Sequence, residues 1–329
     1  MVRKHLLLGV LAMLTAWPVG LLAQPQYQVA ACDWMMLKRQ KLGEFQLAKD
    51  IHADGVEVDM GPLGKRVLFE NKLREPHFQQ LFRRTADSLG IQVPSIAMSG
   101  FFAQSFLARE NYKDLIDDCL KTMDVFGAKI AFLPLGGSGH EWKQPGEAHQ
   151  EMVRRLREAG QMALASGKVI AIRTQLDARA NINLLKEVNC EGIKIYYNLQ
   201  DAVDQQLDPS KELKLLGSKR VAQIHASLTD SVTLDKDLRI DMHKVKKTLD
   251  KMKWKGWLVV ERSRNAKDVR NVRGNFGTNV AYLKEIFKLE ESIITNINAY
   301  EKESFISNNE DMPTAIGRYV FGFMCTRWF

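Results

Sequence analysis

Residues 168–197, KVIAIRTQLDARANINLLKEVNCEGIKIYY, contain one complete strand–helix–strand unit. The run over 168–174 is almost continuously apolar, as is typical of a parallel strand that is covered on both faces. An amphipathic stretch over 178–188 predicts a helix, and 192–197 is a second short apolar run. The stretch therefore predicts two parallel strands joined by a right-handed helical crossover.

The same alternation extends from residue 28 to residue 287. The predicted strands are Gln28–Asp33, Gly55–Asp59, Ile91–Ala97, Ala128–Leu135, Lys168–Thr174, Gly192–Tyr197, Arg220–His225 and Gly256–Glu261. The predicted helices are Leu42–Ile51, Glu75–Leu89, Asn111–Phe126, Pro145–Ser166, Ala178–Val188, Pro209–Leu216, Met242–Met252 and Phe276–Phe287. Eight such units, with no GxGxxG turn after the first strand, favour a closed (β/α)₈ TIM barrel of the α/β class over an open doubly wound sheet.

The two ends of the chain break this alternation. Arg3 and Lys4 precede the apolar run Leu6–Leu22, and the polar residues Gln24-Pro25-Gln26 follow it. This pattern predicts a signal peptide over 1–23 and export to the periplasm or the cell exterior, with a retained membrane anchor as the alternative. We expect a single barrel domain over 24–288 and an irregular tail over 289–329 that is partly helical or disordered.

Charge and cysteine content narrow the possible partners. The formal charge of +8 becomes 8 − 2 = +6 without Arg3 and Lys4, and the basic residues are interspersed with acids, which is typical of a solvated surface and not of a nucleic-acid patch. None of the four cysteines is part of a CxxC pair, so we expect buried thiols. No other segment is long and apolar enough to span a bilayer, so no stable membrane span is expected after signal cleavage, and the oligomeric state is left open.

Polar residues at the ends of the apolar strands are the candidate site, because active sites of TIM barrels lie at the C-terminal ends of the strands. Asp33 and Trp34 follow the first predicted strand, Glu57 and Asp59 lie on the second, and His140 follows the fourth. The later strands contribute a second set, which comprises Arg173, Asn198, Asp201, His225, Glu261, Arg262 and Arg264.

Three segments resemble the second, seventh and eighth strands of the xylose isomerase-like TIM barrels, which include the sugar phosphate isomerase/epimerase family. They are Gly55-Val56-Glu57-Val58-Asp59, Gln223-Ile224-His225-Ala226-Ser227 and Leu258-Val259-Val260-Glu261-Arg262. The resemblance covers nearly all of residues 29–288. It implies a sugar or sugar derivative as substrate and proton transfer beside a sugar carbonyl, so we expect an enzyme of the isomerase class.

The resemblance also implies one divalent metal ion, Mn²⁺, Mg²⁺ or Zn²⁺, held by acids on strands five, six and eight and a histidine on strand seven. Carried over, the metal ligands are His225, Glu261 and Asn198, and Glu261 is also a proton-transfer group. The resemblance supplies no second proton-transfer acid here, and we assign that role to Glu57, which lies on the second predicted strand. Two positions depart from the pattern: Asn198 stands where an Asp is expected and Arg173 where a Glu is expected. A guanidinium repels a metal ion and is a poor base, so three alternatives follow: no metal binds, the metal moves toward another acid such as Glu57, or Arg173 turns away.

Arg173 has two further interpretations, an ion pair with Glu57 or Glu261 and a contact to a carboxylate or phosphate of the ligand. We assign Trp34, His140, Arg173 and Arg262 to substrate binding, with Trp34 stacking on a sugar ring or packing in the core. The predicted function is an exported sugar isomerase/epimerase with an incomplete metal site. The alternative is a non-catalytic barrel that binds a sugar or an anionic ligand, and an endonuclease-like enzyme with several metals ranks last because seven scattered histidines offer too few ligands.

Overall fold

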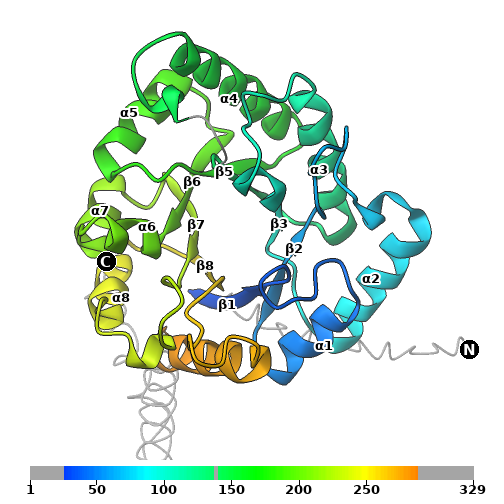
Figure 1. The fold of residues 1–329 in the computed structure, drawn as a ribbon, viewed down its shortest axis with the longest axis vertical. Helices are drawn as coiled ribbons and strands as arrows, with labels where there is room; N and C mark the ends of the chain where they lie inside the picture. Colours follow the sequence, from blue (N-terminus) through cyan, green and yellow to red (C-terminus); the bar gives the residue numbers. More distant parts are fainter. Residues whose placement is uncertain (1–25, 137–139, 288–329) are drawn as a thin grey trace, which may run out of the picture.

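The computed structural model describes residues 26–136 and 140–287, which form one closed barrel of parallel strands (Figure 1). The strands are β1 (Tyr27–Cys32), β2 (Gly55–Asp59), β3 (Ser95–Ala97), β4 (Ile130–Pro134), β5 (Val169–Arg173), β6 (Ile193–Asn198), β7 (Val221–His225) and β8 (Gly256–Val260). They are arranged in chain order, and β1 pairs with β8 to close the barrel. The predicted single-domain TIM barrel is therefore confirmed.

Helices surround the barrel on its outside (Figure 1). They are α1 (Gly43–Asp50), α2 (Pro76–Leu89), α3 (Tyr112–Phe126), α4 (Glu147–Ala165), α5 (Ala178–Val188), α6 (Leu199–Asp204), α7 (Pro209–Leu216), α8 (Met242–Lys251) and a last helix over residues 272–287. Gly90 and Gly127 end α2 and α3 with φ angles of 66° and 69°, so each supplies the left-handed residue that the sequence predicts there.

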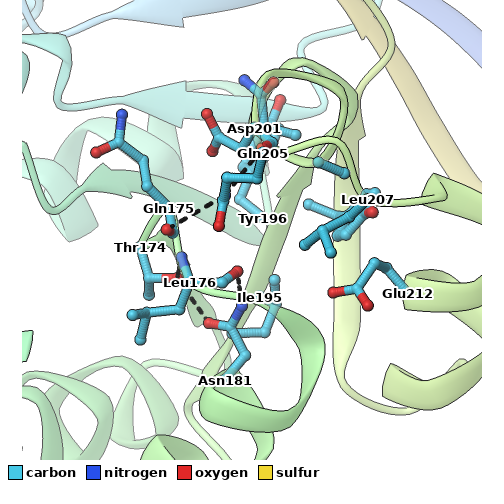
Figure 2. Close-up of a pocket in the computed structure, with 13 residues that line it drawn as sticks. Thr174, Gln175, Leu176, Asn181, Ile195, Tyr196, Asp201, Gln205, Leu207 and Glu212 are labelled. Carbon is cyan, nitrogen blue, oxygen red and sulfur yellow. Dashed lines mark hydrogen bonds between the residues drawn. The ribbon is translucent and has the colours of Figure 1, made fainter. Parts of the chain in front are cut away.

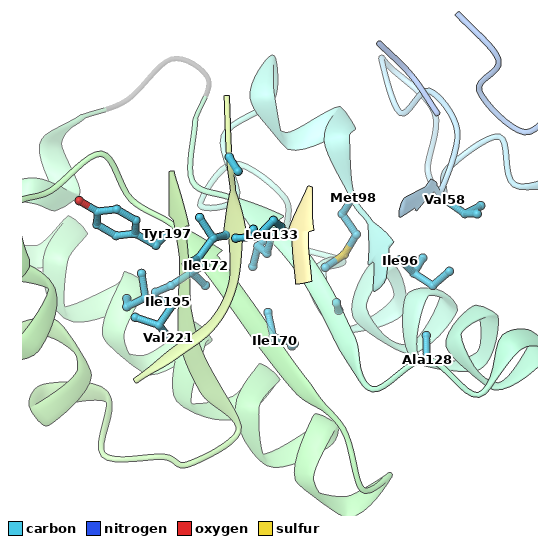
Figure 3. Packing of buried hydrophobic residues seen from close by; sticks show 14 of the residues in the cluster. Val58, Ile96, Met98, Ala128, Leu133, Ile170, Ile172, Ile195, Tyr197 and Val221 are labelled. Carbon is cyan, nitrogen blue, oxygen red and sulfur yellow. The ribbon is translucent and has the colours of Figure 1, made fainter. Parts of the chain in front are cut away.

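Two apolar layers stabilise the barrel. The larger layer lies between strands and helices, and Figure 3 shows Ile170, Ile172, Ile195 and Val221 from three neighbouring strands within it. The smaller layer lies inside the barrel and consists of Ala30, Cys32, Trp34, Ala97, Phe132, Ala171, Tyr196 and Val259. Small and large side chains alternate in it, so the interior is a packed core, and only its C-terminal end is left for a site.

Two predicted features differ in detail. The strand predicted over Ile91–Ala97 is found only over Ser95–Ala97, because Pro94 has no N–H to donate to a neighbouring strand. The short helix α6 was not predicted, and it follows β6 directly, with the Asn198 side chain accepting a hydrogen bond from the Gln200 amide.

The predicted signal segment and tail, and Cys325 with them, lie outside the described residues. Of the other cysteines, Cys32 and Cys119 are buried thiols as expected, and Cys190 is half-buried. Among the residues described, no helix has the length and apolar character needed to cross a bilayer.

Candidate functional site

Four strands bring the central polar residues together at the C-terminal end of the barrel. Register pairs Asn198 on β6 with His225 on β7, and His225 with Val259 on β8, two residues before Glu261. Arg173 is the last residue of β5. Because side chains alternate along a strand, the inward-facing positions at these four strand ends meet over the barrel axis.

Glu261 is the point on which these side chains converge. Its Oε2 atom lies 3.4 Å from Asn198 Nδ2, 3.5 Å from Arg173 Nη1 and 3.6 Å from His225 Nδ1. The Glu261 side chain is only 3% exposed. These distances are longer than those of well-formed hydrogen bonds, so three polar groups face one carboxylate oxygen without saturating it.

Arg173 is fixed by Asp201 from α6. Its Nε and Nη2 atoms donate to the two Asp201 carboxylate oxygens at 2.9 and 2.6 Å, a bidentate pair. Its guanidinium carbon also lies 5.4 Å from the centre of the Phe102 ring. Burial opposes the charge of Arg173, but its hydrogen bonds to Asp201 and the charge of Glu261 outweigh burial and raise its pKa. Of the predicted partners of Arg173, Glu261 is therefore found beside it and Glu57 is not.

Glu57 lies below this level, fully buried inside the barrel. One of its oxygens accepts hydrogen bonds from Ser95 Oγ at 2.6 Å and from the Tyr196 hydroxyl at 2.9 Å, and the other lies 3.0 Å from His225 Nε2. Gln223 Nε2 also lies 3.5 Å from it. Burial, followed by the charge of Glu57, raises the pKa of Tyr196, which therefore keeps its proton.

This position changes the interpretation of Glu57. The sequence assigns it to proton transfer on the sugar, but its oxygens are engaged and none of its surface is exposed. It reaches the mouth of the barrel only through the His225 imidazole. The Nε2 side of the imidazole faces Glu57, and the Nδ1 side faces Glu261 and Asn198.

The other predicted ligand-binding residues are less closely grouped. Trp34 is 8% exposed, stacks on Phe132 at 6.3 Å and meets the edge of His225, so it forms part of the site floor. His140 is exposed, and no interaction described for residues 26–136 and 140–287 joins it to Glu261. Arg262 is half-buried, and its backbone amide donates to Ser227 Oγ. Arg264, expected to reinforce an anionic site, is instead paired with Asp230 at 2.5 Å.

A second polar group lies on the β1–β3 side of the barrel, in which Asp59 is a candidate from the sequence and Arg39 is not. Arg39 Nε lies 3.0 Å from Asp59 Oδ1, and an Arg39 amino group donates to Ser99 Oγ at 3.1 Å. Asp59 also accepts the amide protons of Ser99 and Gly61. Burial raises the pKa of Asp59 to about 6 against the opposing charge of Arg39.

A small cavity adjoins Arg173's partner Asp201 at the ends of β5 and β6 (Figure 2). It has a volume of about 20 Å³, and Thr174, Asn181 and Gln205 line it. That volume holds about one water molecule, so this cavity does not accommodate a sugar. Figure 2 shows the hydrogen bond that Thr174 Oγ1 donates to Asn181 Oδ1 on one side of this cavity.

The residues present do not fit a divalent metal ion. The donors expected from the sequence are His225, Asn198 and Glu261, and only Glu261 has a negative charge. A metal on Glu261 Oε2 would lie close to the Arg173 guanidinium, where each pair of unit charges costs about 4 kcal/mol at 4 Å and an effective dielectric of 20. Asp201 is already committed to Arg173. Within the described part of the chain, no group of three or more His, Cys, Asp and Glu side chains is arranged to hold a metal.

The family that matches this chain has the same barrel fold. The family model of the xylose isomerase-like TIM barrel matches residues 45–286. No curated protein sequence matches the chain.

Solved structures share the architecture at low identity. A xylose isomerase domain protein from Planctomyces limnophilus is 16% identical, with 80% of this chain and 99% of that chain covered and a TM-score of 0.59. A D-allulose 3-epimerase from Methylomonas sp., in complex with D-allulose, is 11% identical, with coverage of 80% and 98% and a TM-score of 0.59. A sugar phosphate isomerase/epimerase from Parabacteroides distasonis is 11% identical, with coverage of 80% and 95% and a TM-score of 0.61.

Proposed function

The chain belongs to the xylose isomerase-like TIM barrel family, and from that premise we propose that it is an exported sugar isomerase that moves a proton beside a sugar carbonyl without a metal. One observation carries this proposal: Arg173, His225 and Asn198 converge on a single Glu261 oxygen at the mouth of the barrel. A nearly buried carboxylate that has no short hydrogen bond and lies beside a fixed cation is suited to taking a proton from a carbon next to a carbonyl.

The reaction has two proton transfers. Glu261 takes the proton from the carbon beside the carbonyl, the C–H electron pair forms a carbon–carbon double bond, and negative charge moves to the carbonyl oxygen. Arg173 donates an N–H hydrogen bond to that oxygen and stabilises the charge. Glu261 then returns its proton to the former carbonyl carbon, while the hydroxyl proton of the first carbon passes to the charged oxygen, so atoms and charge balance.

The geometry favours isomerisation over epimerisation. Epimerisation at one carbon needs an acid on each face of the sugar, whereas isomerisation can use one group that works on one face. Glu57, the second acid expected from the sequence, is fully buried and engaged by Ser95 and Tyr196. Asp59 is engaged by Arg39 and two backbone amides. Glu261 is therefore the one proton-transfer carboxylate that we assign.

The charges favour a neutral sugar over a sugar phosphate. Arg173 is already matched by Asp201 at 2.6 Å and by Glu261 at 3.5 Å. A phosphate at Arg173 would lie beside both carboxylates and would be repelled by them. Support for a sugar also comes from the family, because a structural neighbour is described in complex with D-allulose.

Export is part of the same proposal. Its support is the sequence of residues 1–23, in which Arg3 and Lys4 precede the apolar run Leu6–Leu22.

The experiment is deuterium exchange over a panel of free aldoses and ketoses in D₂O, followed by NMR. We expect one sugar pair to interconvert with deuterium incorporation, and Glu261→Gln to slow this by at least about 100-fold because general acid–base catalysis contributes about 10²–10⁴-fold. Glu191→Gln, an exposed site before β6 at the opposite end of the barrel, is the matched control and should retain the rate. Exchange that survives in Glu261→Gln would contradict the assignment.

A second candidate function is sugar binding without catalysis. It is favoured by the engagement of Glu57, which leaves one free proton-transfer carboxylate in the mouth. It predicts that a sugar raises the melting temperature of the wild-type protein while no deuterium enters any sugar of the panel.

A further inference from the structure

The mouth of the barrel contains a positive charge that cannot leave. Arg173 is 8% exposed, and its side chain extends from the last residue of β5 between Asp201 and Glu261. An arginine stays protonated at every working pH. The site therefore has a resident cation whatever the solution contains.

The surrounding residues hold this cation in one position. Asp201 lies in the first turn of α6, which begins at Leu199 and is capped by the side chain of Asn198. Two N–H groups of Arg173 are used by Asp201, and Phe102 covers the guanidinium. Breaking a buried ion pair costs about 3–5 kcal/mol, so Arg173 does not readily turn away to admit another cation.

The Nη1 group of Arg173, which Asp201 does not bind, lies on the side of Glu261. Nη1 lies 3.5 Å from Glu261 Oε2, a distance too long for a strong hydrogen bond. Nη1 is therefore the N–H donor of Arg173 that is available to a ligand oxygen beside the proton-transfer carboxylate.

We propose that the Arg173 guanidinium is the permanent cation of this site, which binds an oxygen of the sugar carbonyl through Nη1 and takes no divalent metal ion. The role toward the sugar rests on the proposed function, whereas the exclusion of metal rests on the geometry alone. Replacing the guanidinium by a carboxylate should then convert the same side chains into a metal site. Asp201 would be released, and His225 already has a carboxylate on its other nitrogen, as metal-binding histidines usually do.

The test is Mn²⁺ binding to the full chain, followed by electron paramagnetic resonance of the free ion. We expect no stoichiometric binding to the wild-type protein. The Arg173→Glu/Asn198→Asp variant should bind one Mn²⁺ at least about 100-fold more tightly, because it adds two carboxylates and removes the competing cation. Arg239→Glu is the matched control, since Arg239 is also paired with an aspartate, Asp237, but is 39% exposed and separate from the site; it should gain no site.

The single variant Arg173→Ala provides a second test in case the double variant does not fold. It leaves Asp201 and Glu261 without their cation, so Mn²⁺ should raise its melting temperature and leave that of the wild type unchanged. One equivalent of Mn²⁺ on the wild type that is lost in Glu261→Gln would overturn the proposal. So would folded Arg173→Ala and double variants that bind no Mn²⁺. Neither Mn²⁺ binding nor the melting temperature depends on a substrate. The exclusion of metal can therefore be tested even if the isomerase assay fails.

Discussion

Asp33 and Glu44 are two fully buried carboxyl groups that face each other beside the mouth of the barrel. Asp33 accepts the backbone amides of Gln40 and Asp59 through one oxygen. Within the described residues, the other oxygen of Asp33 and both oxygens of Glu44 accept no hydrogen bond from any other group, so a proton shared between the two carboxyl groups would join Asp33 Oδ1 to one Glu44 oxygen. Burial, followed by the charge of Asp59, raises the pKa of Asp33 to about 7, and burial and Asp33 raise that of Glu44.

This pair makes the stability of the protein depend on pH. The folded state keeps protons that the unfolded chain releases near pH 4, so the stabilisation is complete below pH 4 and is lost as pH rises through about 7. The slope is about 1.4 kcal/mol per pH unit for each such proton. We expect the free energy of unfolding in urea to fall between pH 5 and pH 8 in the wild type and to fall less in Glu44→Gln. Equal slopes in both proteins, with Glu191→Gln as control, would disprove the shared proton.

At the residue scale the sequence predicts part of the site. His225 and Glu261 could be identified because they end apolar strands, whereas the depth of Glu57 inside the barrel could not, and its predicted place in the mouth is wrong. The pair between Arg173 and Asp201 could not, since it joins residues 28 positions apart whose separation depends on the closure of the barrel and the start of α6. Glu44 could not either, because its burial depends on how α1 packs against β1 and β2.

At the scale of elements, α4 and β6 approach closely through two glycines. A Cβ atom on Gly192 would overlap the carbonyl oxygen of Gly160 and lie 2.9 Å from the Leu164 Cγ atom. Both clashing groups belong to α4, whose buried residues extend over about three turns from Met152 to Ala163. A side chain at residue 192 would therefore push the helix away from the barrel.

This contact predicts an unequal pair of glycine variants. Gly192→Ala should lower the free energy of unfolding by about 3 kcal/mol or more, because the helix backbone must move. Gly127→Ala adds a Cβ in open space and pays only for its left-handed backbone, about 1–2 kcal/mol. Chemical denaturation of both variants measures this difference, and similar losses in the two would show that α4 can shift freely.

Element boundaries follow from the sequence where a pattern is long. The helices over Ala178–Val188 and Pro209–Leu216 begin and end where they are predicted, because amphipathic periodicity and flanking residues define them. Helix α6 has only six residues, which is too short for a periodic pattern to appear. Pro94 shortens β3 although Ile91, Val93 and Ile96 around it are apolar.

At the scale of the whole molecule, barrel closure assembles the site from distant parts of the chain. Arg173 and Glu261 are brought within 3.5 Å by four consecutive strands, β5 to β8. Glu57 on β2 reaches His225 on β7 across the barrel interior. The mouth is therefore one unit with a fixed cation, one proton-transfer carboxylate and a buried carboxylate that orients the imidazole.

The most direct test of this account is deuterium exchange by chelator-treated protein. The full chain, dialysed against EDTA, is incubated with the sugar panel in D₂O with and without added Mn²⁺, and deuterium at the carbon beside the carbonyl is measured by mass spectrometry. A mechanism without a metal predicts exchange at the same rate in both samples and at least about 100-fold slower exchange in Glu261→Gln. Exchange that occurs only when Mn²⁺ is added would contradict it.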